Sequence, residues 1–321
     1  MPKRRMSVYY IIDIAKALAC LLIANFHSDI LYPDKLSLLS FGGDIGNNIF
    51  FMVSGFALLP SVEKSTSLDI GKWYLKRVMR LLPMLLFFYL LTWGTGGIAI
   101  HDLKDAMRAF VFPTVYWFTG AILIFYLLYY IYEKYFNTAV HICTILLLMV
   151  LHLCWDNISA ERYFIGFISM LLGAWIRKDF TALTEKGKTK KAIPLFCLTG
   201  IIYTVLKLLR KKGIEAFGFI HLGIGVSTVL LASEIIVWGG KYEDKLKIFF
   251  EKHPKIYFVI QKLSMITLAV YLLMGFNNRI IMKGFKERFF FPFSYMINLA
   301  VSLLGAYIIT VVDKKLHELK K

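Results

Sequence analysis

The sequence is poor in cysteine, and no linker or repeat divides it. Its 321 residues include four cysteines, which show neither the Cys-x-x-Cys spacing of a zinc site nor the pattern of a disulfide framework. All four lie in apolar segments, where buried packing is the expected role. Without a repeat, a low-complexity tract or a long linker, we predict one domain over residues 1–321, with no bound metal.

Acidic residues are also scarce. The chain has 21 Asp and Glu against 38 Lys and Arg, which gives a formal net charge of +17. These basic residues occupy short segments between apolar runs and form no separate basic module, which argues against nucleic-acid binding. We interpret the charge as a signal of membrane topology and as an attraction to anionic lipid or to a polyanionic cofactor.

Long apolar runs dominate the rest of the chain. Hydrophobic residues make up 58% of the sequence, and the mean hydropathy is +0.62. Ten stretches approach the roughly 20 residues that a membrane-spanning helix needs. We therefore predict an all-α, polytopic integral membrane protein with about ten transmembrane helices. They are expected at residues 8–27, 45–62, 81–100, 115–132, 139–155, 163–176, 192–209, 216–238, 263–282 and 290–312.

The distribution of basic residues predicts the orientation. The first apolar run is long and no small-residue cleavage site follows it, so we interpret it as an anchor and not as a cleaved signal peptide. If the N-terminus is cytoplasmic and the spans alternate, about two thirds of the Lys and Arg residues fall inside, as the positive-inside rule requires. Both termini are then cytoplasmic. The segment Arg210 to Gly213 contradicts this bias, because it falls outside.

The first apolar run carries three polar side chains, Asp13, Lys16 and His27. Lys16 and His27 share a helix face within about 20°, about 16 Å apart along the axis, and Asp13 lies one turn before Lys16. A charge at the bilayer centre costs roughly 2.5–3.5 kcal/mol, so this face is expected to look into protein or a wet cavity. In the alternative interpretation, Asp13 and Lys16 neutralise each other and His27 only ends the helix.

Two short motifs follow in order: FFMVSG from Phe50 to Gly55, and RVMR from Arg77 to Arg80. Together with Lys16 and His27 they resemble the bacterial integral-membrane acyltransferase family called acyltransferase type three, whose members include glycan O-acetyltransferases. That family has a basic residue, ten residues and then His in its first span, followed by Phe-Phe-x-x-Ser-Gly and Arg-x-x-Arg motifs.

The resemblance continues later in the chain, with departures. Residues Tyr116 to Leu128 and Lys262 to Leu273 are similar to the family's fourth-span and late-span signatures. Lys16 stands where the family usually has Arg, Ile122 where many members have Glu, and Met274 where many have His. Lys and Arg are not equivalent, because Arg offers a planar fork and Lys a single compact charge.

The resemblance implies a multi-pass enzyme of the bacterial cytoplasmic membrane that moves an acetyl or other short acyl group from acyl-CoA to a polysaccharide or lipid-linked sugar. It implies no permanently bound cofactor. His27 is the expected general base, with a transient acyl-imidazole as the mechanistic variant. Asp29 or Asp44 could orient its ring, and Asp13 could support Lys16. Lys16, too far from His27 to share its target atom, is expected to bind the donor or gate its entry.

The two short motifs are expected to serve the donor. Arg77 and Arg80 could pair with its phosphates; the alternative is that they are ordinary positive-inside flankers. Phe50 and Phe51 are interpreted as packing or channel lining, and Ser54 as a contact to the acyl chain. Ser54 is not expected to be a nucleophile, since no glycine precedes it as in a nucleophile elbow. The Ser-Gly pair could instead let two helices approach closely.

Other polar residues in the spans receive weaker assignments. His141, His152 and His221 are interpreted as packing residues, and the segment Asn277 to Arg279 as a candidate acceptor site. Two other functions remain open. A transporter or flippase would also need polar groups within its spans, although the chain shows no paired halves. A pseudoenzyme that organises partners is the third hypothesis.

Overall fold

The computed structural model describes residues 9–66, 69–97, 100–105, 116–154, 158–185, 192–214, 218–280 and 290–319. Within these ranges the regular structure is helical and there are no strands. The long helices are α1 (Tyr10–His27), α2 (Gly43–Glu63), α3 (Ile70–Gly94), α5 (Trp117–Tyr135), α6 (Thr138–Cys154), α7 (Ile158–Lys178), α9 (Ala192–Lys211), α10 (Phe219–Gly240), α12 (Pro254–Ile280) and α14 (Phe293–Leu319). The short ones are η1 (Asp29–Leu31), η2 (Asp34–Leu39), α8 (Phe180–Thr184) and α11 (Glu243–Lys252).

Each predicted apolar segment overlaps one of the long helices, which confirms the all-α class. Six described helical segments are long and apolar enough to cross a membrane by length and composition: α1, α9, α10, most of α12 and α14, and the stretch Asp34–Glu63 that contains α2. The count of ten spans and the cytoplasmic termini stay predictions.

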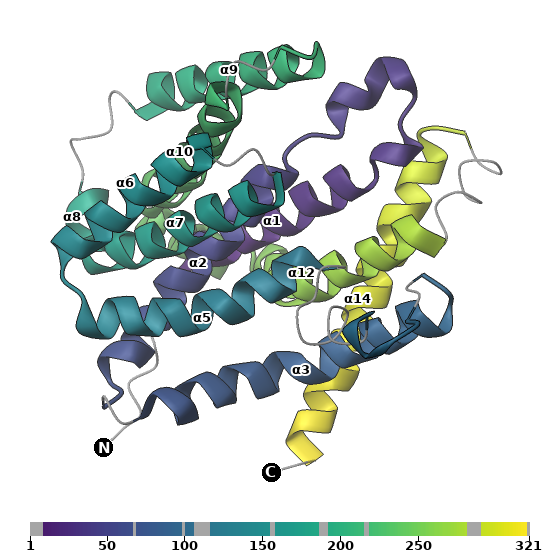
Figure 1. Ribbon diagram of the computed structural model, residues 1–321, viewed down its shortest axis with the longest axis horizontal. Coiled ribbons are helices and arrows are strands. Elements are labelled where there is room, and N and C mark those ends of the chain that lie inside the picture. The colour runs from purple at the N-terminus through teal and green to yellow at the C-terminus, as the bar shows by residue number, and fades with distance from the viewer. Residues whose placement is uncertain are drawn as a thin grey trace.

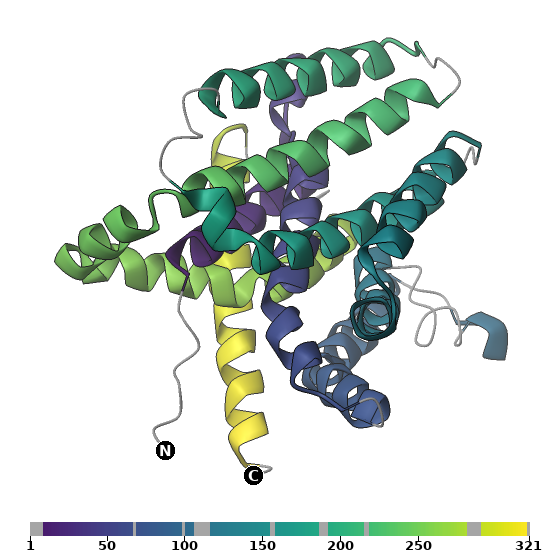
Figure 2. The same ribbon diagram turned by 90° about the vertical axis from the view of Figure 1, so that its left-hand side faces the viewer.

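Helices α1 and α2 occupy the centre of the molecule. Helix α1 packs against α2 on one side and α12 on another, while α2 also contacts α7 and α10. Helix α9 packs on α10, and α14 packs on α12. Figures 1 and 2 show α9 along one edge and α3 along the opposite edge. The polar face of α1 therefore lies within the helix bundle.

The seam between α2 and α7 depends on two glycines. A Cβ atom added to Gly55 would lie 1.9 Å from the carbonyl oxygen of Met170, and one added to Gly173 would lie 1.9 Å from that of Met52. Such distances are far below van der Waals contact, so the two backbones touch only because side chains are missing at both positions. This close approach gives the glycine of the FFMVSG motif a packing role.

Candidate active site

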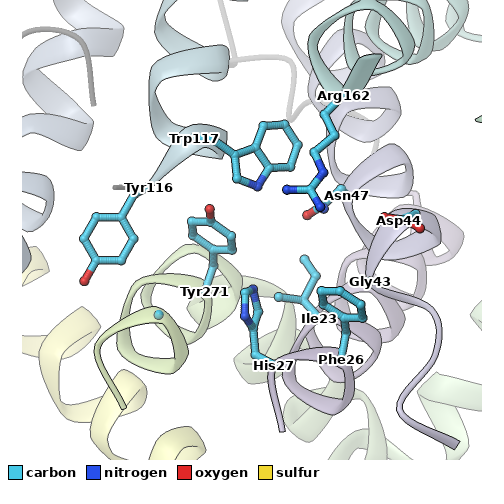
Figure 3. A pocket seen from close by; sticks show the side chains of 11 residues that line it. Ile23, Phe26, His27, Gly43, Asp44, Asn47, Tyr116, Trp117, Arg162 and Tyr271 are labelled. Carbon is cyan, nitrogen blue, oxygen red and sulfur yellow. The ribbon is translucent and has the colours of Figure 1, made fainter. Parts of the chain in front are cut away.

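A cavity of about 330 Å³ lies between five helices near the C-terminal end of α1 (Figure 3). Helices α1, α2, α7 and α12 and the start of α5 supply its walls. Aromatic rings, one imidazole and a few polar groups share the lining, as in many small-molecule sites. The lining residues are Ile23, Phe26, His27, Gly43, Asp44, Asn47, Tyr116, Trp117, Arg162, Tyr271 and Gly275.

His27 is the last residue of α1, and its imidazole points into this cavity (Figure 3). The ring packs edge-on against Tyr271 and Phe26, with both centroid distances 5.7 Å. Asp29 and Arg162 are the charged groups that act electrostatically on the ring. The geometry thus gives His27 access to a bound molecule, whereas its role as a base stays a prediction.

The loop after α1 is tied to the end that carries His27. Asn25 donates hydrogen bonds to the carbonyl groups of Leu39 and Phe41, at 2.8 and 3.1 Å, and accepts one from the Tyr32 hydroxyl at 2.6 Å. Burial, with a further contribution from Tyr295, raises the pKa of Tyr32 to about 12, so this phenol remains a donor at neutral pH. These bonds hold the segment after α1 against the end of the helix that carries His27.

The two phenylalanines of the FFMVSG motif act behind the cavity wall. Phe51 is fully buried and packs on Phe118 with ring centroids 4.6 Å apart, and Phe50 packs on the same ring at 4.9 Å. Phe118 in turn packs on Tyr271 at 5.0 Å, and its backbone N–H donates to the Tyr271 hydroxyl at 3.4 Å. The pair supports the ring that faces His27 and does not itself line this cavity.

Ser54 is occupied within its own helix. Its hydroxyl donates to the carbonyl oxygen of Phe50 at 2.8 Å, a bond to the preceding turn that apolar helices commonly contain. Ser54 is also absent from the cavity lining. The expected contact of this serine with the acyl chain therefore has no geometric support at this cavity.

The three candidate acids lie in different environments. Asp44 lines the cavity and forms an ion pair with Lys207 of α9, at 2.5 Å. Asp29 is exposed, accepts a hydrogen bond from the N–H of Ile30 at 2.8 Å, and acts electrostatically on His27. Asp13 is about 21 Å from His27 along the helix axis, since 14 residues separate the two. Neither Asp29 nor Asp13 lines the cavity.

Asp13 and Lys16 interact with groups on other helices. The Asp13 carboxylate accepts hydrogen bonds from Tyr257 and Ser264 of α12, at 2.9 and 3.0 Å. Direct ion pairs within the described ranges do not include Asp13 with Lys16. The two charges still attract each other, and Arg80 also acts on Lys16. Asp13 thus bonds to α12 in addition to its electrostatic attraction to Lys16.

Arg77 and Arg80 differ in their surroundings. The Arg77 guanidinium donates to the Ser61 hydroxyl at 2.7 Å and to the Trp73 carbonyl at 2.8 Å, and it stacks 3.7 Å from the Trp73 ring centroid. It thereby fixes α3 to the end of α2. Arg80 is exposed. The structure therefore separates two arginines that the motif presents as equivalent.

The sequence analysis missed Arg162 and Asn47. Arg162 lies 5.6 Å from the Trp117 ring centroid and acts electrostatically on both His27 and Tyr271. The amide oxygen of Asn47 is buried and has no hydrogen-bond partner among the described residues. An unsatisfied buried acceptor beside a cavity is a natural contact for a ligand hydroxyl. The available signal was a basic residue on the predicted outer side, where the positive-inside rule disfavours one.

The remaining polar residues of the spans have varied positions. His141 is buried and bonds to Trp175 and to the Tyr132 backbone, at 3.2 and 3.1 Å, which confirms its packing role. Asn277 is buried and donates to Ser302 of α14 at 2.9 Å, which is a helix-to-helix contact, so its place in an acceptor site stays a prediction. The side chains of His152, Asn278 and Arg279 lie outside the described residues.

These features define a class of protein. Several apolar helices surround an imidazole in an aromatic cavity, and no described group of three or more His, Cys, Asp or Glu side chains could hold a metal ion. The chain belongs to the acyltransferase type 3 family, since the family model for the acyltransferase domain matches residues 9–312. Searches of curated proteins and of solved structures returned no significant match. The family match confirms the resemblance drawn from the motifs and supports a multi-pass membrane acyltransferase.

Proposed function

We propose that this protein transfers an acetyl or other short acyl group from acyl-CoA to a hydroxyl of a cell-surface or lipid-linked glycan. The observation that carries the proposal is the imidazole of His27 in a cavity that also presents Arg162 and the unsatisfied amide of Asn47. A sugar offers hydroxyl groups for the amide and a ring face for Trp117. The proposal places the protein in a bacterial cytoplasmic membrane with ten spans and both termini inside.

The proposed reaction needs a base near the acceptor hydroxyl. An alcohol is a poor nucleophile at neutral pH, so His27 takes its proton as the oxygen attacks the thioester carbonyl carbon. The tetrahedral intermediate then breaks its C–S bond. The proton passes from the imidazolium to the departing thiolate, which leaves as CoA. Arg162 and the Tyr271 hydroxyl, which line the same cavity as His27, can donate hydrogen bonds to the developing oxyanion.

Donor binding is assigned to the opposite part of α1. Lys16 lies there, about 16 Å from His27 along the axis, and the positive charge of the exposed Arg80 is near enough to act on it. Cations at this place suit the phosphates of CoA, while the pantetheine arm carries the thioester toward His27. Arg77 holds its local structure through Ser61 and Trp73, so its contribution to the donor site is indirect.

A transfer assay tests this proposal: the purified full-length protein is given labelled acetyl-CoA together with a panel of glycans. Label should appear in an alkali-labile ester on the sugar, and only when both substrates are present. Movement of a glycan across vesicles without any transfer of label would instead favour a transporter or flippase and overturn the assignment.

A further inference from the structure

A second, smaller cavity adjoins the one that holds His27. It has a volume of about 70 Å³ and shares with the first cavity Asp44, Asn47, Trp117 and Arg162. From these shared residues it extends toward α9 and α10, where Arg210 and Thr228 line it. The two cavities thus adjoin each other. We call them together the groove, with His27 lining its first part and Arg210 lining its far arm.

The charges of this groove do not cancel. Arg162 and Arg210 are the arginines that line the second cavity, and Asp44 is the acid. His221, interpreted from the sequence as a packing residue, also lines it. Lys207 neutralises Asp44 through their ion pair at 2.5 Å. The far arm of the groove therefore keeps an excess of positive charge, carried by two guanidinium groups.

The polar side chain of Asn48, which lines the far arm, already has its hydrogen-bond partners. Asn48 donates to the Thr228 hydroxyl at 2.7 Å and accepts a hydrogen bond from Ser169 at 3.0 Å, and all three side chains are buried. The Asn47 amide oxygen, in contrast, has no partner among the described residues. A ligand in the groove thus finds one open acceptor between the imidazole and the two arginines.

We propose that the acceptor is an anionic glycan, whose carboxylate or phosphate binds between Arg162 and Arg210 while a neighbouring hydroxyl reaches His27. This inference rests on the proposed function and adds the substrate class. Guanidinium groups match the planar, two-oxygen geometry of these anions, and Trp117, common to both cavities, supplies a face for the sugar ring. The groove lies at the His27 end of α1, away from the donor cations Lys16 and Arg80.

A binding experiment tests the inference without requiring turnover. It compares a glucuronic-acid oligosaccharide with its carboxyl-reduced counterpart, each added to the full-length protein in detergent. The acidic sugar should bind at least about tenfold more tightly, the scale of one charged hydrogen bond. Arg210→Gln should remove most of this preference, and Arg210→Lys should retain part of it. The matched control is Lys211→Gln, because Lys211 is exposed and contacts Ser37 outside the groove.

A parallel series with a sugar phosphate and its neutral sugar distinguishes the two anion sources, and a preference in either series supports the inference. Equal binding of charged and neutral sugars in both series would overturn it. A loss of acetyl-CoA affinity in Arg210→Gln, with sugar binding intact, would also overturn it and make the groove a donor site. Binding of acidic sugar without any acyl transfer would refute the proposed function and leave the anion site standing.

Discussion

At the residue scale, His27 combines access to the cavity with a position at the end of α1, where its ring makes edge-on contacts with Phe26 and Tyr271. His27→Ala should therefore leave a folded, membrane-inserted protein. Acyl transfer should fall by about two to four orders of magnitude, the usual contribution of a positioned general base. The measurement is ester-linked acyl content of the glycan beside protein abundance in the membrane.

His253→Ala is the matched control, because His253 is exposed at the end of α11 and outside both cavities. This variant should keep its activity. Normal acylation in His27→Ala at normal abundance would remove His27 from the mechanism and leave it as the end of a helix.

The two arginines of the RVMR motif should respond differently to substitution. Arg80→Ala should raise the KM for acyl-CoA more than that for glycan, because ground-state donor binding is lost. Arg77→Ala should mainly lower abundance and thermal stability, because it breaks bonds to Ser61 and to the Trp73 backbone and leaves a cation-stacking site empty. Steady-state kinetics and melting of the purified variants separate the two outcomes. An unchanged donor KM in Arg80→Ala would contradict the assignment.

Helix periodicity placed Lys16 and His27 on one face of a single helix, and the resemblance of the neighbouring motifs to the family singled out His27 as the expected base. Periodicity could not find Arg162 or Asn47, because their nearness to His27 arises from the packing of α1, α2 and α7 against one another. The sequence did carry one clue. Arg162 and Arg210 both fall on the predicted outer side, against the positive-inside bias, and both line the groove.

At the element scale, the packing of α2 on α7 brings Asn47 and Arg162 side by side at the cavity (Figure 3), and Gly55 lies within the seam between these helices. Gly55→Ala should force the two helices apart, because the new methyl group would meet a backbone carbonyl that has no rotamer to adopt. We expect a loss of stability of about 1–3 kcal/mol, together with reduced activity.

Gly200→Ala is the control for this seam. Gly200 lies within α9 with nothing within 4 Å of an added Cβ, so alanine should be neutral or stabilising there. Membrane abundance and melting temperature of both variants provide the comparison. Equal stability of Gly55→Ala and the wild-type protein would contradict the role assigned to this glycine.

Element boundaries were predicted less well than element existence. Helix α3 begins at Ile70, eleven residues before the predicted apolar segment at 81–100, because its basic first half continues the same helix. Likewise α12 begins at Pro254, ahead of the predicted start at 263. The length of an apolar run predicts the part of a helix that fits the hydrocarbon core. It does not predict the polar turns by which the helix extends beyond that core.

At the scale of the whole molecule, contacts join helix ends within the predicted cytoplasmic group and, separately, within the predicted outer group. Lys134 donates to the Ser65 carbonyl, Lys178 pairs with Glu133 at 2.7 Å, and all of these residues belong to predicted cytoplasmic segments. The Glu243 carboxylate likewise accepts hydrogen bonds from the first backbone N–H groups of α1. Each of these contacts therefore joins helix ends that the charge bias places in the same compartment.

The other group contains the segment that contradicted the charge bias. Lys211 donates to Ser37 at 2.8 Å and Lys207 pairs with Asp44, so the end of α9 lies beside the segment that joins α1 to α2. Arg210 to Gly213 must consequently face the same compartment as residues 28–42, whichever compartment that is. Of its basic residues, Arg210 lines the groove and Lys211 contacts Ser37.

Reporter fusions test this arrangement and its orientation together. Fusions after residues 60 and 185 should report the cytoplasm, and fusions after residues 35 and 213 should both report the outside, because contacts join the last two segments and the positive-inside bias places them there. Opposite signals at 35 and 213 would contradict the packing of α9. Cytoplasmic signals at both positions would preserve that packing but invert the molecule. The His27 cavity would then lie on the same side as the cytoplasmic acyl-CoA pool, and the glycan would have to be acylated before export.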